Sequence, residues 1–244
     1  LLTGIALAEM SLGRWDAAVE HLRQAERLDP RSVNSPSSLA RALIHLRRYT
    51  EAREACDRGL ALAPANLALI QFKAMTFLVE GDLAGARAIL KTARKRVEPT
   101  ALVAYMATYS DLVWVLDEEE REVLLRLTPS AFDDNKGVWG LCLAQASALK
   151  GDAASVHTYA EEARKASAKQ LRATPDDAQF QVELSLALAY LGRKEEAIRE
   201  GERAVALLPV ARDALTGPYL QHQLARIYML SGSRRRRATS SSHS

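Results

Sequence analysis

The sequence predicts an all-α protein, specifically an α-solenoid of antiparallel helix pairs. Ala18, Ala52 and Ala86 recur at steps of 34 residues, and a fixed period of this length is typical of stacked helical hairpins. No segment alternates apolar and polar residues for long, and there is no Asn-Gly or Asp-Gly turn, so nothing favours β-strands. Gly and Pro fall mainly between the expected helices, where the chain must turn.

The period covers a whole set of positions in the first three units. The equivalent residues are Gly13, Trp15, Ala18, Leu22, Ala25 and Pro30, then Arg47, Tyr49, Ala52, Cys56, Gly59 and Pro64, then Gly81, Leu83, Ala86, Leu90, Ala93 and Glu98. Small residues permit close helix crossings, and Gly suits the tight turn between two helices. Pro ends a second helix because it has no N–H to donate. Pro99, one residue late, is expected to end the third unit.

This pattern resembles the tetratricopeptide repeat (TPR) family. The resemblance implies a right-handed superhelix whose first helices line a concave face. The segment 188–209 restores the pattern, whereas 101–127 lacks the inter-helix Gly and is interpreted as a degenerate repeat. We therefore expect four regions, which are 1–99 with three well-matched repeats, 100–175 with degenerate hairpins, 176–232 with a C-terminal repeat and an unfinished hairpin, and 233–244 as a disordered basic, Ser-rich tail.

Helical periodicity and turn residues set the expected elements in order. Helix pairs are predicted over 1–12 and 15–28, 36–46 and 50–62, 67–80 and 83–97, 100–116 and 118–127, 138–149 and 153–171, and 176–191 and 194–207, with a single helix over 218–230. Thr50, Asp82 and the Asp176–Asp177 pair are expected to cap helices, because their side-chain oxygens accept N–H groups that have no helical partner. Glu118–Glu120 suit the positive end of a helix.

Composition and charge exclude several functions. The net charge is +3, and Arg234–Arg237 account for all of it, so the rest of the chain is close to neutral and a general nucleic-acid surface is not expected. Cys56 and Cys142 lie in apolar helical settings and are expected to be buried. The loop 132–137 contains two carboxylates but lacks the spacing of a calcium loop, so no metal site is expected. No apolar run is long enough for a membrane span, and we expect no signal peptide. These features suggest a cytoplasmic protein.

No motif points to catalysis. The sequence has no Gly-rich phosphate loop, no His-Glu-x-x-His, no Gly-x-Ser-x-Gly and no protein-kinase signature. We therefore expect no enzyme activity, no cofactor and no small-molecule substrate. The leading hypothesis is a non-catalytic scaffold that binds a protein or peptide.

Resemblance to the repeat family places the partner-binding residues on first helices. By register these residues are Ser37, Arg41, Ile44, His45, Gln71, Met75, Leu78, Val182, Leu186 and Tyr190. Chaperone-adaptor members of the family clamp a terminal carboxylate with Lys, Asn and Arg at such positions. Here Ser37 and Gln71 take those places and only Arg41 is a cation, which argues against capture of a chain terminus. The mixed, apolar groove favours an amphipathic helix or an extended apolar peptide.

Two alternatives stay open. The segment 211–230, with Gly217-Pro218-Tyr219 opening a helix, resembles C-terminal repeats of some bacterial serine/threonine kinases and regulators. This chain would then be the regulatory or sensory half of such a signalling protein. The second alternative is nucleic-acid binding through Arg234–Arg237, which predicts strongly salt-dependent affinity. Arg236–Thr239 also resembles a phosphorylation site for basophilic kinases.

Overall fold

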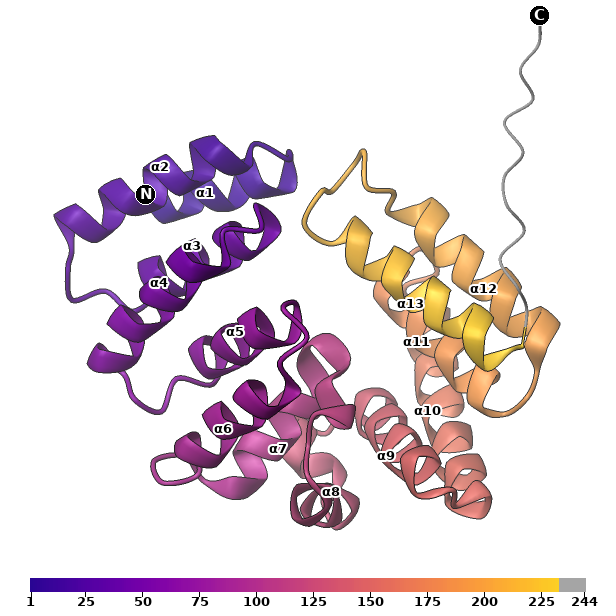
Figure 1. Ribbon diagram of the computed structural model, residues 1–244. Coiled ribbons are helices and arrows are strands. Elements are labelled where there is room, and N and C mark those ends of the chain that lie inside the picture. Colours follow the sequence, from indigo (N-terminus) through magenta and orange to yellow (C-terminus); the bar gives the residue numbers. More distant parts are fainter. Residues whose placement is uncertain (233–244) are drawn as a thin grey trace, which may run out of the picture.

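The computed structural model describes residues 1–232, except for the side chains of residues 109–111. Within this range every regular element is a helix (Figure 1). The helices are α1 (Leu2–Ser11), α2 (Trp15–Leu28), α3 (Asn34–His45), α4 (Tyr49–Leu62), α5 (Leu67–Leu78), α6 (Leu83–Ala93), α7 (Pro99–Thr108), η1 (Tyr109–Trp114), α8 (Glu118–Leu125), η2 (Pro129–Phe132), α9 (Lys136–Lys150), α10 (Ala153–Ala173), α11 (Ala178–Tyr190), α12 (Lys194–Leu207) and α13 (Gly217–Leu230).

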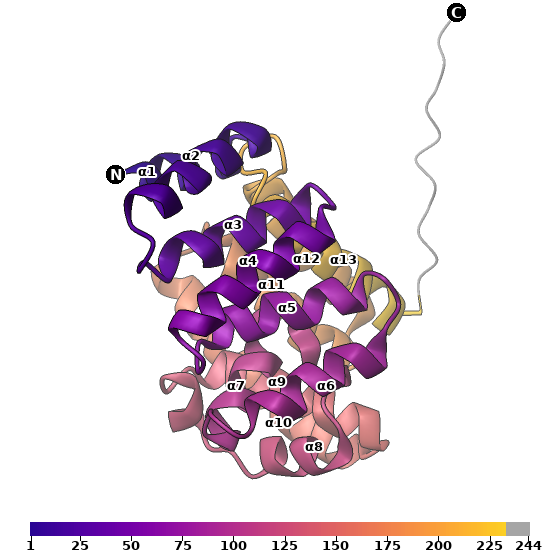
Figure 2. The same ribbon diagram turned by 60° about the vertical axis from the view of Figure 1, so that its left-hand side comes forward.

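Successive helices pair, and the pairs stack side by side along a curved path (Figures 1 and 2). The first helix of one pair contacts the first helix of the next, as α1 does with α3 and α3 with α5. Among the described helices, second helices of neighbouring pairs make no comparable contact. Neighbouring pairs lie closer together on the inside of a curved stack than on the outside. The first helices, which are in contact, therefore form the inner face. This arrangement confirms the predicted α-solenoid of helix pairs.

The repeating small residues lie at the helix crossings, as the period predicts. Ala18, Ala52 and Ala86 have no solvent exposure. A Cβ on Gly59 would lie 2.5 Å from the Leu69 Cδ1 atom, so this position tolerates no side chain without a shift of its neighbour. The burial of these small residues therefore matches the register inferred from the sequence.

The turns inside the first three pairs share one backbone conformation. Gly13 and Gly81 adopt φ angles of 75° and 81°. Arg47, at the equivalent position of the second pair, adopts φ 58°, a left-handed conformation that costs an L-residue about 1 kcal/mol. The fold imposes this turn even where the sequence supplies no glycine.

Some predicted caps are confirmed and others are wrong. The Asp82 carboxylate accepts the Gly85 N–H at 2.7 Å and caps α6. Thr50 is not a cap, because α4 begins one residue earlier and Arg48 occupies the cap position. Of the two aspartates before α11, Asp177 caps the helix by accepting backbone N–H groups of Gln179 and Phe180.

The prediction of one helix over 100–116 is wrong. Helix α7 ends at Thr108 and the chain continues as the 3-10 helix η1. Pro99 does not end the third unit; α6 ends at Ala93 and Pro99 is the first residue of α7. A proline fits there because the first N–H groups of a helix have no partner within the helix.

The loop 132–137 also departs from expectation. Phe132 belongs to η2, and Asn135 caps α9 through its side-chain oxygen. Asp133 and Asp134 adopt positive φ angles of 52° and 58° in the tight turn between the two helices.

A loop contact brings the two ends of the arc together. The Ala214 N–H, in the α12–α13 loop, donates to the Ser11 carbonyl at the end of α1 over 2.8 Å. A Cβ on Gly13 would lie 3.4 Å from the Ala214 Cβ. The Asp213 carboxylate braces the loop by accepting the N–H groups of Leu215 and Thr216. The stacked pairs thus close into a ring (Figure 1).

Helix α13 follows the sixth full pair and packs against α11 and α12. The tail 233–244, with Arg234–Arg237 and Thr239, lies outside the described residues. Over the part that is described, no helix combines the length and the apolar character that a bilayer crossing requires.

Candidate partner-binding surface

The residues predicted to bind a partner lie on α3, α5 and α11, all of which are first helices. They divide by exposure into two groups. The half-buried or exposed residues are Ser37, Arg41, Ile44, His45, Met75, Leu78 and Tyr190. The buried residues are Gln71 at 3 %, Val182 at 0 % and Leu186 at 4 % exposure. These three residues therefore lie outside the accessible part of the predicted surface.

Burial of the α11 residues follows from their neighbours. Val182 and Leu186 share a core cluster with Leu220 and Ile227 of α13. Val182 and Leu186 occupy the same register positions on α11 as the predicted binding residues occupy on α3 and α5. The register does not show that a later helix covers them. Their role here is to hold α11 against α13.

The exposed and half-buried residues of α3 and α5 form the candidate surface, which we call the inner patch: Ser37, Arg41, Ile44, His45, Met75 and Leu78. Met75 and Leu78 pack partly against the core formed by α5 to α9. Ile44 packs partly against the core of the first two pairs. The patch therefore presents apolar side chains that are anchored in the core and remain partly accessible.

His45 is held in place at the edge of the inner patch. Its ring stacks on Trp15, with centroids 4.3 Å apart and an interplanar angle of 11°. Its Nδ1 atom lies 2.9 Å from the Arg41 carbonyl oxygen, at hydrogen-bond distance. These contacts fix the imidazole while leaving it exposed.

Arg41 differs from the other cations near it. Its Nε atom is buried and has no hydrogen-bond partner among the described residues. Burial lowers the pKa of Arg41, and Tyr105 of α7 acts in the opposite direction. By contrast, arginines on second helices are paired across neighbouring units, such as Arg23 with Glu51 at 2.6 Å and Arg58 with Glu26 at 3.1 Å. Arg41 is thus a partly desolvated cation on the inner patch.

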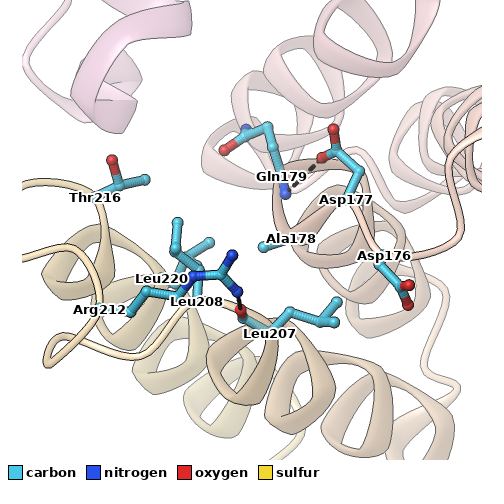
Figure 3. A pocket seen from close by; sticks show the side chains of 9 residues that line it. All are labelled: Asp176, Asp177, Ala178, Gln179, Leu207, Leu208, Arg212, Thr216 and Leu220. Atoms are coloured by element: carbon cyan, nitrogen blue, oxygen red, sulfur yellow. Dashed lines mark hydrogen bonds between the residues drawn. The ribbon is translucent and has the colours of Figure 1, made fainter.

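A recess of about 300 Å³ lies where α11 begins, beneath the α12–α13 loop (Figure 3). Its polar groups are engaged within the fold. The Asp177 carboxylate accepts helix N–H groups, and the Arg212 guanidinium donates to the Leu207 carbonyl at 3.4 Å.

A second, open recess is lined by Leu83, Ala84, Arg87, Ala88, Lys91 and Asp117. Its Arg87 Nε–H donates to the Val115 carbonyl at 2.9 Å. In both recesses an arginine is thus engaged by a backbone carbonyl of the fold.

The cysteines are buried as the sequence predicts. Burial raises the pKa of Cys56 to about 12, so its thiol stays protonated and is a poor metal ligand. Among the described side chains, which leave out those of residues 109–111, no three His, Cys, Asp or Glu residues are grouped so that they hold a metal ion.

Comparison with known proteins supports the repeat interpretation. The family profile described as tetratricopeptide repeat matches residues 3–66, which span α1 to α4. The chain is 36 % identical over 61 residues to the small glutamine-rich tetratricopeptide repeat-containing protein 2 of Mycosarcoma maydis. That match covers 25 % of this chain and 17 % of the relative, so the chain spans a small part of the relative's length.

Solved structures of repeat proteins are among those to which this chain is similar. The Cut9–Hcn1 hetero-tetramer of the APC/C matches with a TM-score of 0.50 and 14 % identity, over 92 % of this chain and 42 % of that one. A thermophilic TPR protein of Thermus thermophilus, TTC0263, matches with a TM-score of 0.44 and 17 % identity, over 93 % and 97 % of the two chains.

Fold and inner patch together define a class, the α-solenoids built from stacked helix pairs. Within that class, the profile match supports tetratricopeptide repeats in the first two pairs, which carry most of the inner patch.

Proposed function

We propose that this chain is a non-catalytic scaffold that binds a segment of another protein on its inner face. The observation that carries the proposal is the inner patch itself. Ile44, Met75 and Leu78 present partly accessible apolar surface on neighbouring first helices, beside the polar groups of Arg41 and His45. Apolar anchors with a few fixed polar groups suit a helix or an extended peptide.

The position of the patch supports the same proposal. Helices α3 and α5 are in contact, so the patch residues lie on adjacent elements. Its ligand would bury the exposed parts of Ile44 and Met75, and a few such anchors carry most of the affinity in protein interfaces.

Affinity measurements on matched variants test the proposal. Peptides are selected from a random displayed library against the full chain, and their affinities are measured by calorimetry. Met75→Glu places a charge in the inner patch, whereas Leu62→Glu makes the same change on the outer helix α4, where Leu62 is 45 % exposed. We expect Met75→Glu to weaken binding by roughly tenfold or more and Leu62→Glu to leave it unchanged.

Because Met75 contacts the core, a second pair of variants controls for folding. Ser37→Arg adds bulk and charge to the patch at a half-buried polar site, and Thr50→Arg does so at an exposed site of α4. Circular dichroism verifies that each variant is folded. Equal affinity of the folded patch and outer-face variants would contradict a ligand on the inner face.

The alternative that this chain is the regulatory half of a signalling protein remains a prediction. It depends on the coding sequence upstream of Leu1, and a kinase or other signalling domain there would support it. Nucleic-acid binding through Arg234–Arg237 concerns residues outside the described range, and a salt-dependent affinity that disappears when the tail is removed would support it.

A further inference from the structure

We infer that Arg41 is the anchor for an acidic side chain, an aspartate or glutamate, in the segment bound by the inner patch. This inference rests on the proposed function and narrows its ligand from an apolar segment to an apolar segment with an internal carboxylate.

The first step is the free-energy cost of the unpaired, buried N–H group of Arg41. A guanidinium carries five N–H donors and remains charged at neutral pH. The Arg41 Nε atom is buried and has no hydrogen-bond partner among the described residues. A buried donor of a charged group that is left unpaired is costly, and buried polar groups in native structures nearly always pair with protein, water or an ion.

The second step is that the described side chains supply no counter-ion for Arg41. No ion pair is formed between Arg41 and a described carboxylate, although Arg53, on the neighbouring α4, is paired with Glu80 at 2.7 Å. The described group that acts electrostatically on Arg41 is Tyr105 of α7, and Ser37 lies one turn before Arg41 on α3. The inner patch therefore has an unneutralised positive charge beside apolar side chains.

The third step is the chemistry that this charge recognises. The planar guanidinium fork matches a carboxylate with two parallel hydrogen bonds, and partial burial strengthens such bonds. Gln71, the amide that would help to hold a chain terminus, is buried at 3 % exposure and already has an interaction within the protein. A single fork without flanking cations or a free amide favours one internal acidic side chain.

Matched peptides and Arg41 variants test the inference. Amidated peptides with apolar positions and one central Glu are compared with the same peptides carrying Gln. We expect the Glu peptides to bind the wild-type chain roughly tenfold or more tightly than the Gln peptides. We expect Arg41→Met to abolish this preference and Arg58→Met, on the outer helix α4, to retain it.

Thermal denaturation distinguishes a binding role of Arg41 from a purely structural role, because the two roles predict opposite changes in the melting temperature of Arg41→Met. Arg41→Met removes an unpartnered charge from a partly buried site, so we expect its melting temperature to rise above that of the wild type. Ser37→Glu supplies a carboxylate four residues before Arg41 and should likewise raise the melting temperature while weakening Glu peptides. If Arg41 only supported the fold, Arg41→Met would melt lower.

The outcomes separate this inference from the proposed function. Suppose that Met75→Glu weakens peptide binding, but that the wild type and Arg41→Met each bind the Glu and Gln peptides equally well. The inference about Arg41 then fails, whereas the proposed binding on the inner face is supported. A preference that appears only for peptides with a free C-terminus would overturn the assignment to a side chain. A Glu preference that survives Arg41→Met would show that another residue binds the acid.

Discussion

Two charged side chains, Arg41 and Glu183, are removed from water under different circumstances. Glu183 of α11 is 5 % exposed and accepts a hydrogen bond from the Gln179 Nε2 atom at 3.1 Å. A Cβ on Gly137 would lie 3.1 Å from its Oε2 atom and 3.3 Å from the Ser167 Oγ atom, so helices α9, α10 and α11 meet around this carboxyl. Arg41 belongs to the inner patch, whereas Glu183 lies inside the stack of helices. The protonation of Glu183 therefore affects the stability of the fold.

Glu183 makes stability depend on pH. Burial raises the pKa of Glu183 from 4.5 to about 7, and the charge of Asp177 adds to this. Between these values the folded chain holds a proton that the unfolded chain has lost, so stability falls as pH rises through this window, by roughly 3 kcal/mol. Glu183→Gln should remove this loss and stabilise the protein at pH 8, while changing little at pH 4.

Urea unfolding at pH 4, 6 and 8 measures the effect. The control is Glu54→Gln, because Glu54 is exposed on α4. A Glu183→Gln variant whose stability follows the wild type in parallel at all three values would contradict a proton bound at Glu183.

At the scale of the elements, close helix crossings set which glycines are needed. A Cβ on Gly140 of α9 would lie 2.7 Å from the Tyr159 carbonyl oxygen and 3.0 Å from the Ala163 nitrogen of α10. Both are backbone atoms, so the two helices would have to separate. In contrast, a Cβ on Gly4 of α1 would meet nothing within 4 Å.

Alanine at these two glycines should therefore have opposite effects. We expect Gly140→Ala to lower the free energy of unfolding by about 1–3 kcal/mol through overpacking. Gly4→Ala should raise it by about 0.5–1 kcal/mol, because alanine restricts the unfolded chain and favours a helix. Denaturant unfolding of both variants measures the difference, and a shift of the same sign in both would show that the α9–α10 crossing is wrongly placed.

Local patterns explain why most elements could be predicted. The small residues at Ala18, Ala52 and Ala86 and the turns at Gly13 and Gly81 depend only on their own hairpins, and the structure confirms them. The 3-10 helix after Thr108 could not be predicted, because the segment keeps the spacing of an α-helix. Thr50 failed as a cap because the left-handed turn at Arg47 starts α4 one residue earlier.

At the scale of the whole molecule, the loop contact between Ser11 and Ala214 closes the ring. One hydrogen bond contributes a net stabilisation of about 1 kcal/mol, so the closure is weak compared with the stacking of the pairs. Nothing in the sequence signals this contact, because it joins residues more than 200 positions apart that share no motif.

Opening the ring should enlarge the molecule. Ala214→Arg places a long side chain against Gly13, whereas Ala211→Arg makes the same change at an exposed site of the same loop. We expect small-angle X-ray scattering to show a larger radius of gyration for Ala214→Arg and no change for Ala211→Arg. Identical scattering of Ala214→Arg and the wild type would mean that the contact does not hold the ends together.

The candidate site was only partly predictable for a related reason. Register identifies Arg41 as the one arginine among the predicted partner-binding residues, but its unpaired Nε atom is visible only once α7 and the neighbouring pairs are in place. Val182 and Leu186 occupy matching register positions, yet α13 buries them. Exposure depends on the whole stack, which a 34-residue period does not describe.

The measurement that tests the central claim most directly is the affinity of a selected peptide for Met75→Glu and Leu62→Glu, both verified as folded. An apolar ligand on the inner face predicts weaker binding to Met75→Glu and wild-type binding to Leu62→Glu. Wild-type affinity in Met75→Glu, or an equal loss in both variants, would contradict it.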